Sequence, residues 1–163
     1  MGRKNVRNPL LDQLRTLGLA EHTSPEKFIP EDYLYSDVED RLALLQGLMD
    51  TDGSVNGEVK VEYSTTSPLL AENVKELVQS LGGTVRLGSR ITFYTHKGEK
   101  RAGKTSYRLY VKLPSNVMPF RLSRKANAYH PAGKYEPHRS IVKIEYVGQD
   151  YAQCIMLDSE NQL

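Results

Sequence analysis

The stretch Leu45-Gln46-Gly47-Leu48-Met49-Asp50-Thr51-Asp52-Gly53 decides the fold of this chain of 163 residues. It is largely apolar around a central glycine and becomes acidic at Asp50 and Asp52. Upstream, Ser36-Asp37-Val38-Glu39 is typical of a capping box, so the sequence predicts a helix from Ser36 to about Asp50. Asp52 then lies at the exit, with Gly53 free to turn the chain. Because a helix dipole disfavours carboxylates at its C-terminus, two of them here indicate a metal ion.

Gly47 lies in the interior of this expected helix, where glycine costs about 1 kcal/mol relative to alanine. The simple explanation is that the fold tolerates this cost. The sharper explanation is that another element packs too closely on this face to leave room for a Cβ atom. A second, similar helix is the natural candidate for that element.

The downstream pattern changes from a helical period to a period of two and back again. Val55, Val61 and Tyr63 alternate with polar residues around an Asn56-Gly57 turn, which indicates a hairpin. A second helix is expected to begin at Pro68 and to stop at Gly82-Gly83, with these residues on its buried side: Leu69, Leu70, Val74, Leu77, Val78 and Leu81. A second hairpin is expected over residues 84–113, with its tip at 97–104, and a short helix over 120–129.

The second hairpin has one apolar and one polar face. Val85, Leu87, Ile91 and Phe93 occupy odd positions of its first strand, while the even positions carry polar and basic side chains. Residues 84–125 hold eleven Lys and Arg residues against Glu99 alone. The bland interpretation is a solvated basic surface, but such a surface normally mixes both signs. The pattern therefore favours a β-ribbon that contacts nucleic acid in the major groove.

Composition limits the remaining possibilities. The chain is 39% hydrophobic and 26% charged, which suits a folded domain. Its one cysteine, Cys154, permits no internal disulfide, fits an intracellular location, and is expected to be a buried strand residue. No apolar run approaches the roughly 20 residues of a membrane span, so no membrane partner is expected. Strands are also expected in the tail, around Ile141, Ile144, Tyr146 and residues 152–157.

With Leu45 to Gly53 at the end of its first helix, the chain resembles one repeat of the LAGLIDADG homing endonucleases. The flanks Lys27-Phe-Ile-Pro30 and Ser64-Thr-Thr-Ser67 are similar to the second repeat of an intein-encoded endonuclease. The resemblance implies an α+β fold of the order αββαββα, an antiparallel β-saddle with helices packed on one face. It also implies a helical lead-in over residues 1–35, an endonuclease repeat over 36–130, and a linker with strands over 131–163 similar to the C-terminal intein splicing segment.

The resemblance further implies a site. Asp52 and Gly53 would bind Mg²⁺, and Asp50 would have a mostly structural part. By position alone, Lys125 would assist catalysis and Thr66 would position water. Leu45, Gly47 and Leu48 would pack against the helix of a second repeat. The residues expected to contact DNA are Lys60, Glu62, Arg86, Arg90, Thr92, Tyr94, His96, Lys97, Lys100, Arg101, Lys104, Ser106, Arg108, Tyr110, Lys112 and Arg124.

The implied function is a site-specific, Mg²⁺-dependent endonuclease of double-stranded DNA, located in the cytoplasm of a prokaryotic or phage-infected cell. A single Asp52 cannot hold such a metal site, because Mg²⁺ needs several oxygen ligands. A homodimer or a second repeat must therefore complete it. Two alternatives stay open: a DNA-binding module without cleavage, and an intein fragment that does not splice, since the chain has no N-terminal nucleophile and no terminal His-Asn.

Overall fold

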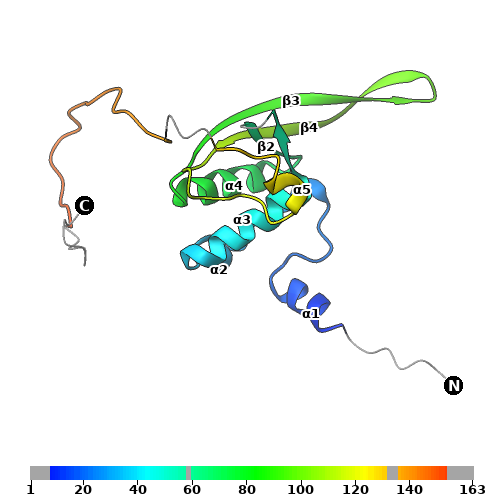
Figure 1. The fold of residues 1–163 in the computed structure, drawn as a ribbon, viewed down its shortest axis with the longest axis horizontal. Coiled ribbons are helices and arrows are strands. Elements are labelled where there is room, and N and C mark those ends of the chain that lie inside the picture. Colours follow the sequence, from blue (N-terminus) through cyan, green and yellow to red (C-terminus); the bar gives the residue numbers. More distant parts are fainter. Residues whose placement is uncertain (1–7, 58–59, 132–135, 154–163) are drawn as a thin grey trace.

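The computed structural model describes residues 8–57, 60–131 and 136–153. From residue 38 onward, the order of elements is the expected αββαββα (Figure 1). The elements are α1 (Pro9–Thr16), a 3₁₀ turn η1 (Ser24–Glu26), α2 (Glu31–Leu34), α3 (Val38–Asp52), β1 (Gly53–Asn56), β2 (Lys60–Thr65), α4 (Pro68–Ser80), β3 (Thr84–His96), β4 (Glu99–Lys112) and α5 (Ser123–Ala126).

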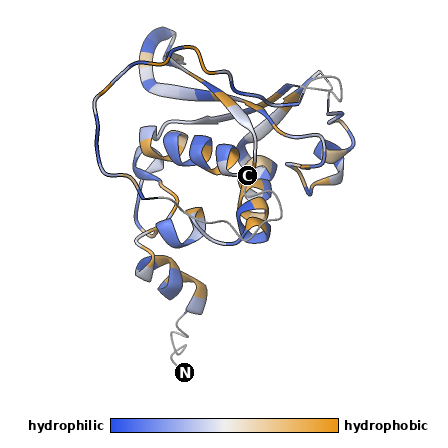
Figure 2. Ribbon diagram, turned by 90° about the vertical axis from the view of Figure 1, so that its left-hand side faces the viewer, coloured by the Kyte–Doolittle hydropathy of each residue, from blue (hydrophilic) through white to orange (hydrophobic). Residues whose placement is uncertain are grey.

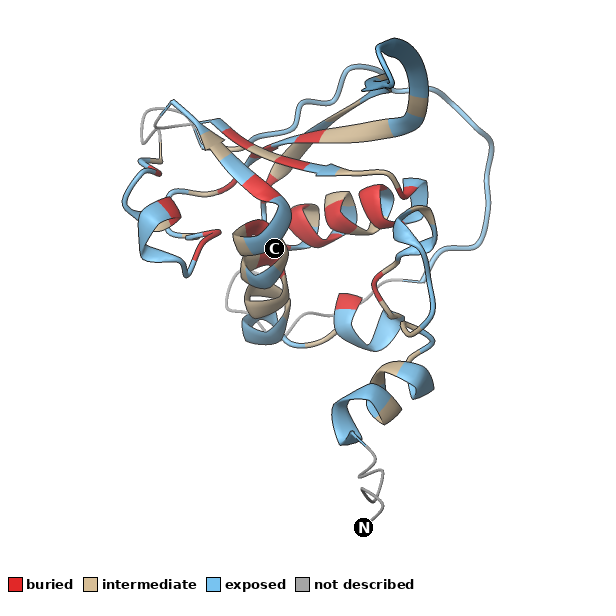
Figure 3. Ribbon diagram, turned by 90° about the vertical axis from the view of Figure 1, so that its right-hand side faces the viewer, coloured by how far each residue is buried: buried red, intermediate tan, exposed pale blue. Residues whose placement is uncertain are grey.

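The four strands form one antiparallel sheet in the order β1-β2-β4-β3. One face of the sheet packs on α4 and α3, and the buried residues concentrate between these layers (Figure 3). Hydrophobic and hydrophilic stripes alternate along α4, as burial of only one helix face requires (Figure 2). The fold class predicted from the sequence is confirmed. The core comprises Ile29, Leu34, Leu45, Met49, Val61, Tyr63, Leu70, Ala71, Val74, Leu77, Val78, Leu81, Leu109, Val111, Leu113, Phe120 and Tyr129.

Helix α3 begins one or two residues later than expected. Its N-cap is Asp37, which makes no side-chain capping hydrogen bond, and the hydroxyl of Ser36 donates to the carbonyl of Tyr33 at 2.9 Å. The predicted capping box is therefore wrong. At the other end, α3 continues to Asp52, and the N–H of Gly53 donates to the carbonyl of Met49.

Helix α4 begins as predicted. The hydroxyl of Ser67 accepts from the N–H of Leu70 at 3.0 Å and donates to the carbonyl of Lys27 at 2.6 Å, which fastens the chain before α2 to this helix. Leu69 was expected on the buried side, yet its side chain is 55% exposed, because it lies on the outward side of the first turn. The glycine stop holds, with Gly82 at φ +80°.

Strands β3 and β4 form a ribbon that projects beyond the helices (Figure 1). Its tip is the two-residue turn Lys97-Gly98, with both residues at positive φ, and not the predicted eight-residue loop. The odd-numbered face of β3 belongs to the core only near the base. Ile91 and Phe93 are each 59% exposed, because none of the described helices lies under this part of the ribbon.

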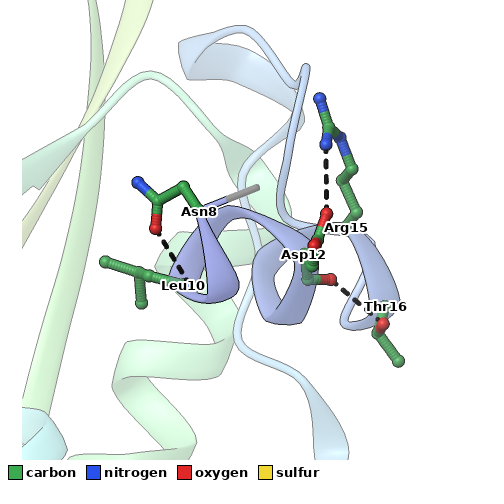
Figure 4. A network of polar contacts seen from close by, with 5 residues as sticks. All are labelled: Asn8, Leu10, Asp12, Arg15 and Thr16. Atoms are coloured by element: carbon green, nitrogen blue, oxygen red, sulfur yellow. Dashed lines mark hydrogen bonds and ion pairs between the residues drawn. The ribbon is translucent and has the colours of Figure 1, made fainter. Parts of the chain in front are cut away.

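The N-terminal helix α1 begins after its N-cap, Asn8 (Figure 4). The side-chain oxygen of Asn8 accepts from the N–H of Leu10 at 3.1 Å, and Asp12 bonds Arg15 and Thr16 one turn later. None of the helices in the described ranges is long and apolar enough to cross a membrane.

The tail does not form the strands expected around residues 141–153. Residues 136–153 carry no helix or strand, and Ile141, Ile144 and Tyr146 are 83 to 87% exposed. The physical reason is that this segment does not pair with the four-stranded sheet, so its backbone lacks the partner that a strand requires. The expected strand position of Cys154, and the rest of residues 154–163, lie outside the described residues.

Candidate nucleic-acid interface and helix-terminal acidic site

The face of the sheet that points away from the helices is polar. Strand register brings Arg86 beside Tyr110 and Tyr110 beside Glu62, while Arg90 pairs with Ser106 and Arg108 with Ser64. The guanidinium carbon of Arg86 lies 5.8 Å from the centre of the Tyr110 ring. We call this surface the polar face: Lys60, Glu62, Ser64, Arg86, Arg90, Ser106, Arg108, Tyr110 and Lys112.

The polar face brings together half of the residues predicted to contact DNA. Its one acidic residue, Glu62, forms an ion pair with Arg108 at 3.2 Å, so the remaining charge of the face is positive. A shallow pocket of about 240 Å³ lies between Arg86, Arg90 and Arg108. The Nε atom of Arg108 is buried and has no hydrogen-bond partner among the described residues. Such a pocket suits an anionic group such as a phosphate.

Several predicted DNA contacts lie away from this face. Lys100 pairs with Thr95 and is therefore on the opposite side of the ribbon. Lys104 lies where the pairing of β3 and β4 is irregular, and its carbonyl accepts from the hydroxyl of Thr92 at 2.7 Å. Arg124 is on α5, outside the sheet. The remaining predicted contacts lie on the part of the β3–β4 ribbon near its tip. They are exposed except for Thr92, which is half-buried: Thr92, Tyr94, His96, Lys97 and Arg101.

Asp50 has a structural part, as the sequence resemblance implies. Its two carboxylate oxygens accept from the backbone N–H groups of Arg121 and Leu122 at 3.1 to 3.2 Å. Next to it, Gln46 accepts from the Nε of Arg121 at 2.7 Å and donates to the carbonyl of Met118 at 2.9 Å. Asp50 and Gln46 therefore hold the segment before α5 against α3.

Asp52 is exposed at the end of α3 and lines a pocket of about 240 Å³. Ser64 and Ser106 of the polar face line the same pocket, so it opens toward the basic surface. Burial raises the pKa of Tyr63 to about 12, and the neighbouring Asp52 carboxylate contributes to this rise. The carboxylate thus lies where the helix end, the sheet and the polar face meet.

Thr66 lines this pocket together with Asp52. Its hydroxyl oxygen is buried and has no hydrogen-bond partner among the described residues. A buried hydroxyl without a protein partner is suited to hold a water molecule. Ser24 and Lys27 also line the pocket, and the sequence reasoning missed them. They precede Asp52 by 25 residues or more, and no local pattern links them to it.

Lys125 is buried at the C-terminus of α3, with 8% of its surface exposed. Its ammonium donates to the carbonyls of Met49 and Asp50, each at 2.8 Å, and of Gly53 at 2.6 Å. Burial, followed by the charge of Arg124, lowers its pKa, whereas Asp50 and Asp52 act in the opposite direction. All three donors of the ammonium are used, so Lys125 serves as a C-terminal cap of α3.

Gly53 has a steric role. A Cβ atom added there would lie 2.5 Å from the carbonyl oxygen of Met49. The backbone is extended at φ −83°, so glycine is needed here for close packing and not for a turn. Its carbonyl already accepts from Lys125, which disfavours it as a metal ligand. The described residues contain no group of three or more His, Cys, Asp or Glu side chains able to hold a metal.

The three residues expected to pack on a second helix separate in the structure. Leu45 is fully buried in the core of this chain, so it is not available to a partner, contrary to the prediction. Leu48 is half-buried. Gly47 is exposed, and a Cβ atom added there would meet nothing within 4 Å. The open side of α3 is therefore the side of Gly47.

Comparison with known proteins agrees with this architecture. Residues 39–113 match the family of the LAGLIDADG-like domain. The chain is 30% identical over 155 residues to a replicative DNA helicase DnaB from Mycobacterium intracellulare, covering 93% of this chain and 25% of that protein. It is 30% identical over 131 residues to a replicative DNA helicase DnaB from Nostoc sp., covering 74% of this chain and 15% of that protein. The chain thus spans a quarter or less of these relatives, and its residues 39–113 are similar to the LAGLIDADG-like domain.

Proposed function

We propose that the chain is half of a homing endonuclease that cleaves both strands of DNA with the help of Mg²⁺. The observation that carries this proposal is the position of Asp52. A carboxylate at the end of α3 lies in a pocket that opens onto a basic, polar sheet face. The basic face would bind the phosphate backbone, and the carboxylate would act next to a phosphate held there.

The oxygen atoms at this site suit Mg²⁺ in part. Asp52 would hold the ion, and Thr66, with its unpartnered hydroxyl, would position water. Bound Mg²⁺ would supply an activated water and neutralise charge at the phosphorus. Lys125 would act by holding the helix end that presents Asp52, because its donors are already used by three carbonyls. The Gly53 carbonyl contributes through this same contact.

A second LAGLIDADG repeat would complete the site. One carboxylate from this chain does not satisfy Mg²⁺, and the Gly47 side of α3 is free to receive another helix. That helix would come from a second copy of this chain or from another part of a longer protein. The partial match to two much longer helicases supports the second source, because an intein inserted in such a protein would match in this way.

The test is cleavage of a randomised DNA library by the parent and by Asp52→Asn. We expect Mg²⁺-dependent cutting by the parent and none by the variant, with equal DNA binding. Asp40→Asn, an exposed acidic residue on the first turn of the same helix, is the matched control and should cut like the parent. Unchanged cutting by Asp52→Asn would refute the metal role. Gel filtration should show a species near twice 18.4 kDa if two copies form the enzyme.

A DNA-binding module without cleavage is the second candidate. The use of Lys125 as a structural cap and the single carboxylate favour it, because both leave little catalytic machinery in this chain. It predicts salt-dependent DNA binding by a monomer and no cut site in the library. An intein fragment without its own activity predicts a monomer that binds no DNA. An intracellular location, implied by a DNA substrate, stays a prediction.

A further inference from the structure

The chain before α2 forms one wall of the pocket that holds Asp52. Residues 24–30, which we call the lead-in arm, contact α4 before the chain enters α2. Ser24 and Lys27 of this arm line the pocket, and Lys27 is the one cation among the described residues that do so. The position of the lead-in arm therefore decides where this charge lies relative to the Asp52 carboxylate.

Two side chains of α4 hold the backbone of the lead-in arm on either side of Phe28. The hydroxyl of Ser67 donates to the carbonyl of Lys27 at 2.6 Å. The side-chain oxygen of Asn73 accepts from the N–H of Ile29 at 3.1 Å. These two backbone groups belong to the two peptide units that flank Phe28, so both units are fixed relative to α4. Helix α4 thus supplies the polar partners that a neighbouring strand would otherwise supply.

The apolar side of the lead-in arm is less closely packed. Ile29 is buried in the core, whereas Phe28 and Pro30 are half-buried and line a cavity of about 420 Å³. Lys27 lines both this cavity and the Asp52 pocket, so it lies between the two. Apolar contacts carry no direction, and a surface that borders a cavity lacks part of its packing. The two hydrogen bonds from α4 therefore determine the orientation of the arm.

Asn73 is the more informative of the two α4 residues. Ser67 also caps α4 by accepting from the N–H of Leu70, so its loss would disturb the helix as well. Asn73 lies in the helix interior, where asparagine is less favourable than leucine or alanine because its side chain competes with the backbone. Its side chain is half-buried, and its hydrogen bond within the described residues joins it to Ile29, 44 positions earlier in the chain.

We infer that Asn73 is a positioning residue of the Asp52 site, which acts through the backbone of residues 27–29 and sets where Lys27 enters the pocket. A phosphate next to Asp52 would place two negative groups together, and a cation offsets this charge only from a fixed position. Asn73 is not one of the described residues that line the pocket, so its effect is indirect. This inference rests on the proposed function and names a residue that controls the geometry of the same site.

Amide hydrogen exchange of the full chain tests whether Asn73 holds the arm. Asn73→Leu keeps the size of the side chain and suits a helix but removes the acceptor, whereas Asn73→Asp keeps an oxygen in the same place. We expect the Ile29 amide to exchange about tenfold faster in Asn73→Leu and at the parent rate in Asn73→Asp. The control is Tyr35→Phe, which removes a hydroxyl that donates to Glu76 of α4 at 2.8 Å and should leave the exchange of Ile29 unchanged.

Single-turnover cleavage tests whether this contact matters at the site. The substrate is the duplex recovered from the randomised library, used at saturating concentration with Mg²⁺. Asn73→Leu should cut about tenfold more slowly or worse with unchanged DNA affinity, Asn73→Asp should restore the rate, and Tyr35→Phe should cut like the parent. In a Lys27→Ala background, Asn73→Leu should have no further effect, because both changes act through the same ammonium group.

The outcomes separate the inference from the proposed function. If the parent cuts and Asn73→Leu cuts equally fast, or exchanges Ile29 at the parent rate, the inference is wrong and the proposed function stands. If Asn73→Leu slows cutting by the same factor with and without Lys27, Asn73 acts elsewhere and the inference is again wrong. If the parent cuts no duplex, both are wrong. All rates are compared at a temperature where circular dichroism shows each variant to be fully folded, so that unfolding does not imitate a loss of positioning.

Discussion

Replacing Lys125 by methionine tests how the end of α3 is held. The change keeps the length of the side chain and removes three hydrogen bonds, of 2.6 to 2.8 Å, to the carbonyls of Met49, Asp50 and Gly53. The Met49 carbonyl keeps the N–H of Gly53 as a partner, but the remaining two lose a charged donor in a buried setting. A buried acceptor without its partner costs about 1 to 3 kcal/mol. A cation at a helix C-terminus adds about 0.5 to 1 kcal/mol, and the better burial of methionine offsets part of the loss.

We therefore expect Lys125→Met to lower the free energy of unfolding by about 3 kcal/mol. Urea unfolding followed by circular dichroism measures this change. The control is Lys75→Met, which breaks an exposed ion pair with Glu72 and should cost no more than about 0.5 kcal/mol. Lys125→Arg should recover only part of the loss, because a planar guanidinium cannot direct its donors at three converging carbonyls.

A midpoint for Lys125→Met equal to that of the parent would refute the reasoning, since the three hydrogen bonds would then contribute nothing. The same variant also tests the predicted catalytic part of Lys125. If cleavage is lost at a temperature where the variant is fully folded and binds DNA normally, Lys125 acts in cleavage, directly or by placing Asp52. If cleavage follows the folded fraction, its part is structural.

Four further predictions concern single residues of the same region. Gly53→Ala should lower the free energy of unfolding, measured in urea, by about 1 to 3 kcal/mol, because its Cβ would lie 2.5 Å from the Met49 carbonyl oxygen. Gly47→Ala should raise the stability of the isolated chain by about 1 kcal/mol, yet weaken self-association in gel filtration if α3 packs on a second α3. Asp50→Ala should cost about 1 to 2 kcal/mol in urea unfolding, because two backbone N–H groups lose their acceptor. The pKa of Tyr63 is raised to about 12 in the folded chain, from an ordinary value of 10. The contribution of Tyr63 to the free energy of unfolding should therefore be constant below pH 10 and fall by about 3 kcal/mol between pH 10 and 12. Tyr63→Phe should remove the tyrosinate absorbance of this residue, which appears near pH 12.

Much of the fold follows from local patterns. The helix that ends at Asp52, the turn that begins at Gly57, the cap at Ser67 and the alternation along β3 are each encoded by neighbouring residues. Such features are predictable because periodicity and capping act over a few residues. The capping box at Ser36 was wrong because α3 begins one residue later, with Asp37 as its N-cap, and the hydroxyl of Ser36 donates to the carbonyl of Tyr33 in the preceding turn. The strands expected over residues 141–153 do not form, because a strand needs a second strand to pair with, and the local sequence does not specify which segment that is.

The site divides in the same way. The sequence by itself determined that Asp52 ends a helix and that a basic ribbon follows, because both features are encoded by local sequence patterns. Only the tertiary structure decided that Lys125 caps α3 from more than 70 residues away, that Leu45 is buried in its own core, and that a bulge divides Lys100 and Arg101 between two faces. These outcomes depend on which carbonyls, faces and strands meet in space, and contacts across such sequence separations leave no periodic signal in the chain.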